Sequence, residues 1–423
     1  MLDIQFIRDN ADLVKTACQN KNLDEKIIDQ LITVDEQRRK SLLEVEKLRA
    51  EGNLNAKKIK EQVHAGGSPD ADLVAHGKKV KQQLKEIEPG LKDLEEQYLD
   101  LMLQVPNVPA ADTPVGSDES GNEVLKTVGE KPNFDFNLLP HHELMEKLDI
   151  LDSKRAVKIA GFRAYYLKGD GVLLEQALLR YAMDLLMQEG FTPMTVPVMV
   201  NKEAMVGTGY FPWGAEDHYK TQDGQILTGT AEVSLTAYHM GETLAEKDLP
   251  VQIAGVSPCF RREVGAHGKD TAGVVRVHQF NKVEQVVYTV ADEEETRKWH
   301  DKMAVLSERL LTDLGLSYQV LAMCTGDMGA GQRKKYDIET WFPAQDKYRE
   351  THSASYFNDF QSRRLNIRYQ AKDGSLKHVY TLNNTMAASP RLLAAIIENY
   401  QTAEGTIKVP EVLQPYMGKE EIK

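Results

Sequence analysis

A seam of apolar residues spaced three and four positions apart runs through residues 73–101 and limits what this chain can fold into. Its members are Leu73, Val80, Leu84, Ile87, Leu91, Leu94, Tyr98 and Leu101, with Gly77 as the one weak position. Such an a/d pattern predicts a helix that packs against a partner helix. The dipeptide Pro89-Gly90 lies inside the pattern, and we expect it to kink the helix.

The partner helix is expected in the stretch that begins near Leu31, although its pattern is less regular. Leu42, Val45, Ile59 and Val63 fit a seam, whereas Arg49 and Gly52 interrupt it. Between the two arms, the segment HAGGSPDAD contains two glycines and a proline, which favours a reversal of the chain. The sequence therefore predicts an antiparallel helical hairpin, a coiled coil. By itself, such a hairpin is more often a spacer or an oligomerisation device than a nucleic-acid reader.

The composition changes after the hairpin. VPNVPAADTPVGSDESGN has no hydrophobic period and reads as a linker. LLEQALLRYAMDLLMQEGF then has helical spacing, and a short extended run around Met194–Val200 contains Pro197. The β-rich pieces VQIAGVSPCFRRE, VRVHQFNKVEQVVYTV, NIRYQ and HVYTLNN are separated by loops, which favours an antiparallel sheet flanked by helices. We predict an α+β fold with a helical domain at 1–104, a linker at 105–124 and a second domain at 125–423.

The charge distribution is uneven. A net charge of −12 argues, taken alone, against a nucleic-acid partner. Between Arg38 and Lys85, however, twelve Lys and Arg stand against six Asp and Glu, which leaves −18 for the rest of the chain. A basic segment on an acidic body would direct phosphate contacts to one place. A solvated helical face is the simpler alternative.

Several classes of protein find no support. The three cysteines are far apart and lack metal-ligand spacing, so neither a disulfide framework nor a structural zinc is expected. No apolar run reaches the roughly 18 residues of a membrane span, and the acidic start MLDIQFIRDNADLV is unlike a signal peptide. We expect a cytoplasmic protein with no membrane contact. Neither a P-loop nor a GxGxxG fingerprint accompanies a strand–helix junction.

The segment CFRREVGAHGKDTAGVVRVHQFNKVE predicts a strand, a glycine-containing loop and a second strand. We expect Arg261 and Glu263 on one face at the end of the first strand, and the loop contains Gly265, His267, Gly268, Lys269 and Gly273. Along the second strand, Arg276, His278, Phe280, Lys282 and Glu284 alternate. Unpaired buried charge is costly, so this face suits a polyanionic, aromatic ligand, with arginines on phosphates and an aromatic ring on a base. An exposed face with salt bridges is the alternative.

These residues carry a resemblance to a known family. FRREVGAHGKDTAGVVRVHQFNKVE resembles motif 2 of the class II aminoacyl-tRNA synthetases in its seryl form, TLNNTMAASPRLLAAIIENYQ resembles motif 3, and EGFTPMTVPVMV resembles motif 1. LTGTAEVSLTAY, CTGDMGAGQRKKYDIETWFPAQDKYRE and DFQSRRLNIRY are further strings of the seryl type. With the N-terminal hairpin, the resemblance covers essentially the whole chain.

The resemblance implies roles for particular residues. ATP would be bound by Arg261, Arg262, Glu263, Arg276, Phe280, Glu350, Ser353 and Arg391, of which Arg261, Arg276 and Arg391 would be catalytic. Glu350 and Ser353 would hold Mg²⁺ beside ATP. Serine would be surrounded by Thr230, Ala231, Glu232, Arg261, Glu284, Asn383 and Thr385.

The resemblance also implies a reaction and partners. L-serine would react with ATP to form seryl-adenylate, and the seryl group would pass to the 3′-terminal ribose of tRNA(Ser), and of tRNA(Sec) if that tRNA is also served. The hairpin would bind the tRNA, and the protein would be a homodimer. A second hypothesis is a synthetase-derived ligase that charges a small amino acid to a carrier protein, but such paralogues lack a long arm. A third is a coiled-coil scaffold that has lost catalysis, which the retained site residues argue against.

The chain departs from the common bacterial pattern at a few positions. After Glu350 it reads THSASYFNDF where the family typically has ISSCSNCTDF, so His352 and Phe357 are unexpected beside the proposed metal pair. Motif 3 reads NNTMAASPR in place of NGSGLAVGR, and Gly229 stands where proline usually precedes TAE. These departures concern the serine pocket more than the ATP site.

Overall fold

The computed structural model of the chain describes residues 1–265 and 272–423, which form two compact units. One unit comprises Leu2–Gln19 and Leu23–Pro106, and the other comprises Met1, Asn20–Asn22 and Asn107–Lys423. Three residues of the glycine-containing loop named above, His267, Gly268 and Lys269, lie outside the described residues. The division of the chain at residues 104 and 124 stays a prediction.

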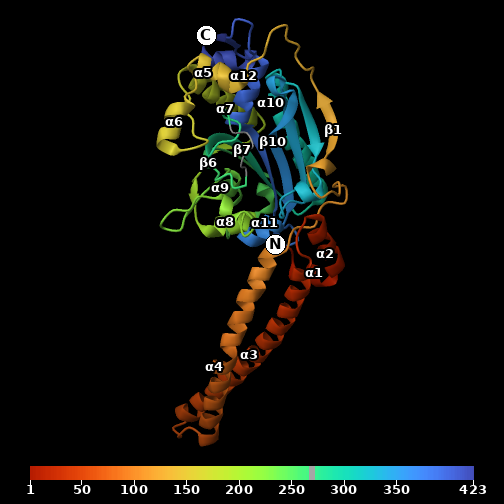
Figure 1. The fold of residues 1–423 in the computed structure, drawn as a ribbon. Helices are drawn as coiled ribbons and strands as arrows, with labels where there is room; N and C mark the ends of the chain where they lie inside the picture. Colours follow the sequence, from red (N-terminus) through yellow and green to blue (C-terminus); the bar gives the residue numbers. More distant parts are fainter. Residues whose placement is uncertain (266–271) are drawn as a thin grey trace. The chain divides into compact units, whose positions relative to one another are not determined.

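The first unit is the helical hairpin that the seam predicts. Its helices are α1 (Ile4–Asp9), α2 (Ala11–Asn20), α3 (Lys26–His64) and α4 (Ala71–Gln104). Figure 1 shows α3 and α4 side by side. They run antiparallel, since the Arg38 guanidinium lies 4.3 Å from the centre of the Tyr98 ring near one end and Asn55 contacts Leu73 near the other. Helix α4 continues through Pro89 without ending.

The seam of α3 differs from the predicted one at Leu48, Gly52 and Val63. Leu48, with 9% of its surface exposed, occupies the seam position beside Arg49. Gly52 also belongs to the seam, because a Cβ added there would lie 3.4 Å from a Val80 methyl group. Near the tip, Val63 is 52% exposed and lies outside the seam, so its predicted place there is wrong.

One polar residue, Asn55, is buried in this seam with 5% of its surface exposed. Its Nδ2 donates a hydrogen bond of 2.7 Å to the backbone oxygen of Leu73. Opposite it stands Gly77, where an added Cβ would lie only 2.9 Å from Asn55 Nδ2. Gly77, the weak seam position of α4, therefore leaves room for the side chain of Asn55 on α3.

The second unit is organised around an eight-stranded sheet. Its strand order is β1 (Glu123–Val128), β8 (Tyr318–Ala322), β9 (Lys334–Phe342), β10 (Lys347–Asn358), β13 (Tyr380–Ala388), β7 (Gln279–Thr289), β6 (Val251–Phe260) and β2 (Thr192–Thr195). All neighbours pair antiparallel except β2 and β6, which are parallel. The predicted α+β class, an antiparallel sheet flanked by helices and preceded by a hairpin, is confirmed.

The two faces of this sheet are different. Helices α7 (Asp170–Gln188), α10 (Glu293–Asp313) and α12 (Ser389–Asn399) cover one face (Figure 1). On β7, Val283 and Val287 belong to the core that these helices bury. Successive side chains of a strand point to opposite faces, so Lys282 and Glu284 point away from that core, toward the functional face.

Smaller elements complete the unit. The helices are α5 (His141–Lys147), α6 (Ser153–Ala160), α8 (Lys202–Thr208), α9 (Glu232–Thr236), α11 (Phe360–Leu365) and α13 (Gln414–Met417). A three-stranded sheet contains β12 (Leu376–His378), β11 (Arg368–Gln370) and β5 (Thr243–Ala245). Two strand pairs are β3 (Met199–Val200) with β4 (Ile226–Leu227), and β14 (Ile407–Lys408) with β15 (Glu421–Ile422).

The strands that flank motif 2 are shorter than the sequence predicts. Strand β6 ends at Phe260 and β7 begins at Gln279. Arg261 and Glu263 therefore follow the first strand, and Arg276 and His278 precede the second, which corrects the strict alternation expected for these four residues. Phe280, Lys282 and Glu284 do alternate along β7 as expected.

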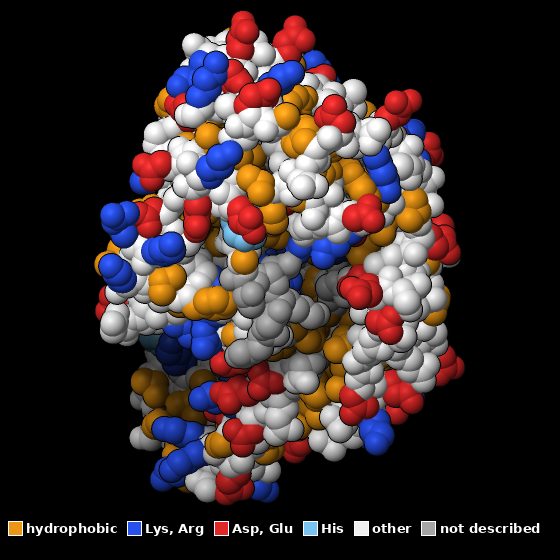
Figure 2. All heavy atoms as spheres, turned by 45° about the horizontal axis from the view of Figure 1, so that its top comes forward, with side chains coloured by type: hydrophobic (Ala, Val, Ile, Leu, Met, Phe, Trp, Pro, Cys, Tyr) orange, Lys and Arg blue, Asp and Glu red, His pale blue; other side chains and the backbone are white. Residues whose placement is uncertain are grey.

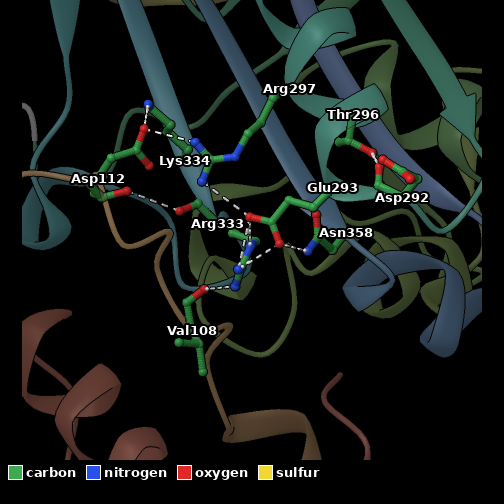
Figure 3. A network of polar contacts seen from close by, with 10 residues as sticks. Val108, Asp112, Asp292, Glu293, Thr296, Arg297, Arg333, Lys334 and Asn358 are labelled. Atoms are coloured by element: carbon green, nitrogen blue, oxygen red, sulfur yellow. Dashed lines mark hydrogen bonds and ion pairs between the residues drawn. The ribbon is translucent and has the colours of Figure 1, made fainter.

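A charged network ties the segment after Pro106 to the sheet and to α10 (Figure 3). The Arg333 guanidinium binds both carboxylate oxygens of Glu293, at 3.0 and 2.9 Å. The Asp112 carboxylate accepts from Arg297 at 2.9 Å and from Lys334 at 2.6 Å. Although this stretch reads as a linker, it is anchored by paired charges.

Among the described residues, no helix is long and apolar enough to cross a membrane.

Candidate active site

A cleft of about 510 Å³, part of it open to solvent, lies on the face of the sheet that α7, α10 and α12 leave free. Its lining residues are Arg261, Glu263, Val275, Arg276, Val277, Phe280, Lys282, Glu350, Thr351, Thr385, Ala388, Pro390 and Arg391. Figure 2 shows Lys and Arg side chains gathered in a hollow of this face of the molecule. A shallower, strongly cationic extension is lined by Arg276, Lys347, Tyr348, Arg349, Glu350 and Arg391.

Arg261 is positioned by the backbone at the end of β6. Its N–H donates to the His278 carbonyl at 2.9 Å, and its Nε donates to the Gly229 carbonyl at 3.3 Å. The guanidinium lies 5.3 Å from the centre of the Phe280 ring, a cation–π distance. Arginine and aromatic ring are thus presented together to the cleft.

Glu263 adopts a left-handed backbone conformation with φ of 55°. That conformation costs a residue with a side chain on the order of 1 kcal/mol, and such strain is concentrated at functional sites. The carboxylate lies 3.5 Å from Arg276 Nε, and Arg276 follows residues 266–271 in the sequence. The backbone conformation and the ion pair together place the Glu263 side chain in the cleft.

A bulge in β10 places the proposed metal pair on one face. In a regular strand, residues three apart point to opposite faces, so Glu350 and Ser353 would be separated by the sheet. The register against β9 shifts between Glu350 and His352, where an extra residue, Thr351, is accommodated. Glu350 pairs with Glu339, and Ser353 pairs with Asp337, so a step of three residues along β10 matches a step of two residues along β9. The bulge thus allows the two side chains to share one face of the sheet.

Arg391 leaves the first turn of α12, which begins at Ser389 with Pro390 in a position that suits a helix start. Its Nη1 donates to the Glu350 backbone oxygen at 2.7 Å and to Glu350 Oε2 at 3.0 Å. Partial burial of Glu350 opposes its ionisation, but Arg391 and then Lys335 outweigh this effect and lower the pKa of that carboxyl to about 2. Glu350 is therefore ionised at neutral pH.

Three predicted serine-site residues meet on β7 and β13. Glu284, 2% exposed, accepts from the Thr385 hydroxyl at 3.3 Å and forms an ion pair with Lys282. Lys282 Nζ also lies 3.4 Å from the Thr385 hydroxyl. Asn383 is 6% exposed, and its Nδ2 has no hydrogen-bond partner within the described part of the chain. A buried amide without a partner is costly, and a bound ligand would relieve that cost.

The remaining predicted serine-site residues lie around the start of α9. Thr230 is 2% exposed and Ala231 is fully buried, and the Glu232 backbone N–H donates to the Thr230 hydroxyl at 3.1 Å. Both oxygens of the Glu232 carboxylate are engaged, one by Gln361 Nε2 at 3.0 Å and the other by the Tyr210 hydroxyl at 2.8 Å. Burial, and then repulsion from Glu284, raise the pKa of Glu232 to about 7.

The structure brings together most of the predicted ATP set. Arg261, Glu263, Arg276, Phe280, Glu350 and Arg391 all line the cleft. Two members of the predicted set, Arg262 and Ser353, are not among its lining residues. The Arg262 guanidinium instead donates to the Glu216 backbone oxygen at 2.7 Å on an exposed surface. Among residues 1–265 and 272–423, no group of three or more His, Cys, Asp and Glu side chains is arranged to hold a metal.

His352, which the sequence leaves unexplained beside the metal pair, belongs to the other face of β10. It is 1% exposed and shares its face with Ala354, whose carbonyl lies 3.0 Å from His300 Nε2 of α10. Its Nδ1 is 2.9 Å from the Thr351 hydroxyl, and burial lowers the pKa of His352 to about 4. The residue is therefore a neutral core histidine.

Three residues of the site are absent from the predicted set. Lys282 could have been predicted from the sequence, since it alternates with Phe280 and Glu284 along one strand. No pattern in the sequence points to Tyr210 and Gln361, because they are distant in sequence from Glu232 and become its partners only through folding.

The fold and cleft were compared with known proteins. Residues 217–400 match the family model of the tRNA synthetase class II core domain (G, H, P, S and T), and residues 1–109 match that of the seryl-tRNA synthetase N-terminal domain. A serine–tRNA ligase of Deinococcus radiodurans is 44% identical, covering 100% of this chain and 99% of its own.

Solved structures agree with the sequence relatives. Seryl-tRNA synthetase from Pyrococcus horikoshii complexed with ATP aligns with a TM-score of 0.91 and 38% identity, covering 100% of this chain and 99% of its own. The cytoplasmic serine–tRNA ligase from Naegleria fowleri in complex with AMP aligns with a TM-score of 0.87 and 33% identity, over 100% and 99%.

The antiparallel sheet, the cleft with its arginines and the core-domain match define a class II aminoacyl-tRNA synthetase. With the hairpin and the full-length relatives, the chain belongs to the seryl-tRNA synthetase family.

Proposed function

We propose that this chain is a serine–tRNA ligase, which activates L-serine with ATP and transfers the seryl group to tRNA(Ser). The observation that carries the proposal is the arginine-rich cleft, whose lining residues Lys282 and Thr385 contact the buried carboxylate of Glu284. The arginines suit a nucleoside triphosphate, and the buried carboxylate and hydroxyl beside them suit an ammonium group and a hydroxyl. Full-length similarity to serine–tRNA ligases supports the same assignment.

In the proposed reaction, a carboxylate oxygen of serine attacks the α-phosphorus of ATP, and pyrophosphate leaves. Arg261 would bind the α-phosphate and neutralise the charge that develops there. Phe280 and Arg391 would lie on the two faces of the adenine ring, and Glu263 would accept from its amino group. Arg276 and Arg391 would bind the terminal phosphates. No covalent nucleophile of the protein is needed, because alignment and charge neutralisation lower the barrier.

Mg²⁺ is proposed to bind beside ATP at Glu350 and Ser353. An ionised carboxylate and a hydroxyl on one face are oxygen ligands of the kind Mg²⁺ takes, with phosphate oxygens and water completing its shell. The lowered pKa of Glu350 supports this role, since the ligand is deprotonated at neutral pH. Bound there, the ion would supply positive charge to the phosphates.

Serine would be bound between Glu232 and Glu284, with Thr230 and Thr385 nearby. A carboxylate pair attracts the ammonium group. Asn383 Nδ2, which has no partner among the residues that the structure describes, and the Thr385 hydroxyl are available to polar atoms of the ligand. A site built to hydrogen-bond a hydroxyl rejects alanine strongly, because its own polar groups would lose their partners.

The hairpin is proposed to bind tRNA, and the protein is proposed to act as a cytoplasmic homodimer. Of the Lys and Arg residues between Arg38 and Lys85, several are exposed along both helices, including Lys57, Lys58 and Lys78. Their charge would attract the phosphate backbone. Light scattering of the purified protein tests the dimer: a mass of one chain would contradict it. Whether tRNA(Sec) is also served is left to a charging assay with that tRNA.

The central experiment is pyrophosphate exchange into ATP with each small amino acid, followed by charging of tRNA. We expect exchange with serine and transfer to tRNA(Ser). Exchange with glycine or alanine but not serine, with transfer to a carrier protein and none to tRNA, would support the carrier-protein ligase instead. No exchange with any amino acid would support a scaffold.

A further inference from the structure

Tyr210 contacts Glu232, one of the predicted serine-site residues, and its position is set by α8. That helix ends at Thr208, and Gly209 follows with φ of 87°, a left-handed conformation that turns the chain. The Tyr210 ring then packs edge-on against His218, with 5.7 Å between ring centres. The Gly214 N–H donates to the Tyr210 carbonyl at 2.7 Å, which closes the turn. Ring and backbone are both positioned before any ligand arrives.

The hydroxyl of Tyr210 reaches Glu232. It donates a hydrogen bond of 2.8 Å to Oε2, while Gln361 Nε2 donates to Oε1 at 3.0 Å. Gln361 is itself held, since it accepts from the Thr381 hydroxyl at 2.6 Å and donates to the Thr208 carbonyl at 3.0 Å. Glu232 thus accepts hydrogen bonds from two donors. Gln361 is fixed by its own hydrogen bonds, and Tyr210 is fixed by the turn after α8.

We infer that Tyr210 is a positioning residue of the amino-acid pocket: its hydroxyl orients the Glu232 carboxylate toward the ammonium group of the substrate. The inference deepens the proposed function and rests on it. Hydrogen bonds to a carboxylate are strong and directional, so a donor on a rigid ring defines where the charge lies. Losing it would leave one oxygen of a buried carboxylate without its partner.

The surroundings of Glu232 make its ionisation sensitive to this one donor. The charged and titratable groups that act most strongly on it are Tyr210 after α8 and Lys282 and Glu284 on β7, while α11 contributes the uncharged Gln361. Burial and Glu284 raise the pKa of Glu232, and Tyr210, Lys282 and Gln361 lower it. Because Tyr210 lowers this pKa, its loss would raise it further, and the carboxylate would become protonated at a higher pH.

The test is Tyr210→Phe in the full-length protein, which keeps the ring and removes only the hydroxyl. Serine-dependent pyrophosphate exchange is measured against serine concentration, ATP concentration and pH. We expect the KM for serine to rise roughly 10- to 100-fold, as for loss of a hydrogen bond to a charged group, with the KM for ATP unchanged. We also expect the acid limb of the kcat/KM profile for serine to move to higher pH.

The matched control is Tyr181→Phe, which removes a tyrosine–carboxylate bond of similar length, 2.7 Å to Asp313, between α7 and α10. It should leave both KM values and the pH profile as in the unmodified chain. A serine KM and acid limb of Tyr210→Phe that match the unmodified chain would overturn the inference alone. Equal rises in the KM for serine and for ATP would also overturn it, because they indicate a general packing defect. If the unmodified chain shows no serine-dependent exchange, the proposed function fails, and the inference fails with it.

Discussion

Arg391→Ala offers the sharpest test of the ATP half of the cleft. The guanidinium borders both the main cleft and its cationic extension, and it donates twice to Glu350. Removing it deletes a charge-assisted contact to phosphate, worth about 1.5–3 kcal/mol, and releases Glu350 from its ion pair. We expect a loss of about 2–4 kcal/mol in transition-state stabilisation, or about 30- to 1000-fold in kcat/KM for ATP. Serine-dependent pyrophosphate exchange measures it.

The same substitution should barely affect folding. The Arg391 side chain is 25% exposed and Glu350 is 44% exposed, so their ion pair contributes at most about 1 kcal/mol to stability. Arg391→Lys keeps the positive charge but loses the planar guanidinium with its several hydrogen-bond donors. Its kcat/KM for ATP should therefore fall between those of the alanine variant and the unmodified chain. Arg180→Ala removes an exposed arginine–carboxylate pair on α7 and serves as the control. Exchange by Arg391→Ala within about threefold of the unmodified chain, or a loss that tracks loss of folded signal, would refute the reasoning.

Other consequences of the structure are open to direct measurement. Gly77→Leu, which the apolar pattern alone would favour, should destabilise the hairpin by about 1–3 kcal/mol through crowding of Asn55; a higher melting temperature would contradict this. Against the opposing effect of burial, Lys334 and Arg297 hold the pKa of Asp112 well below its usual value. Asp112→Asn should therefore cost under about 1 kcal/mol in urea unfolding at neutral pH, and the difference should shrink as the pH falls below about 4; a constant difference would contradict it. Deleting residues 38–85 should leave pyrophosphate exchange intact and abolish tRNA charging, and surviving charging would remove the hairpin's proposed role. Arg262→Ala should change the KM for ATP less than about twofold, since its guanidinium lies outside the cleft lining; a larger rise would restore its predicted ATP contact.

The features predictable from the sequence are those with a regular period. The hairpin follows from a seam that repeats along α4, and the helix α7 follows from its helical spacing. The seam of α3 was harder to place, because a polar residue, Asn55, occupies a buried position. Its compensation, the absent side chain of Gly77, is on the other helix and cannot be read from either pattern alone.

The site was predictable where short motifs carry it and unpredictable where backbone irregularity or distant partners do. Phe280 and Lys282 share a face because β7 is regular there. Glu263 reaches the cleft through a left-handed backbone, which alternation cannot anticipate. Tyr210 binds Glu232 across 22 positions of sequence, and only the folded chain shows that the two residues meet.

The bulge in β10 also bears on how this segment can change over time. Loss of Thr351, the extra residue, would leave Glu350 and Ser353 two positions apart in a regular strand, so their side chains would still share a face. Loss of a second residue between them would make the two neighbours, and their side chains would then point to opposite faces of the sheet. We therefore expect natural variants of this stretch to differ in residue type, and to keep the two residues either three positions apart with the bulge or two positions apart without it.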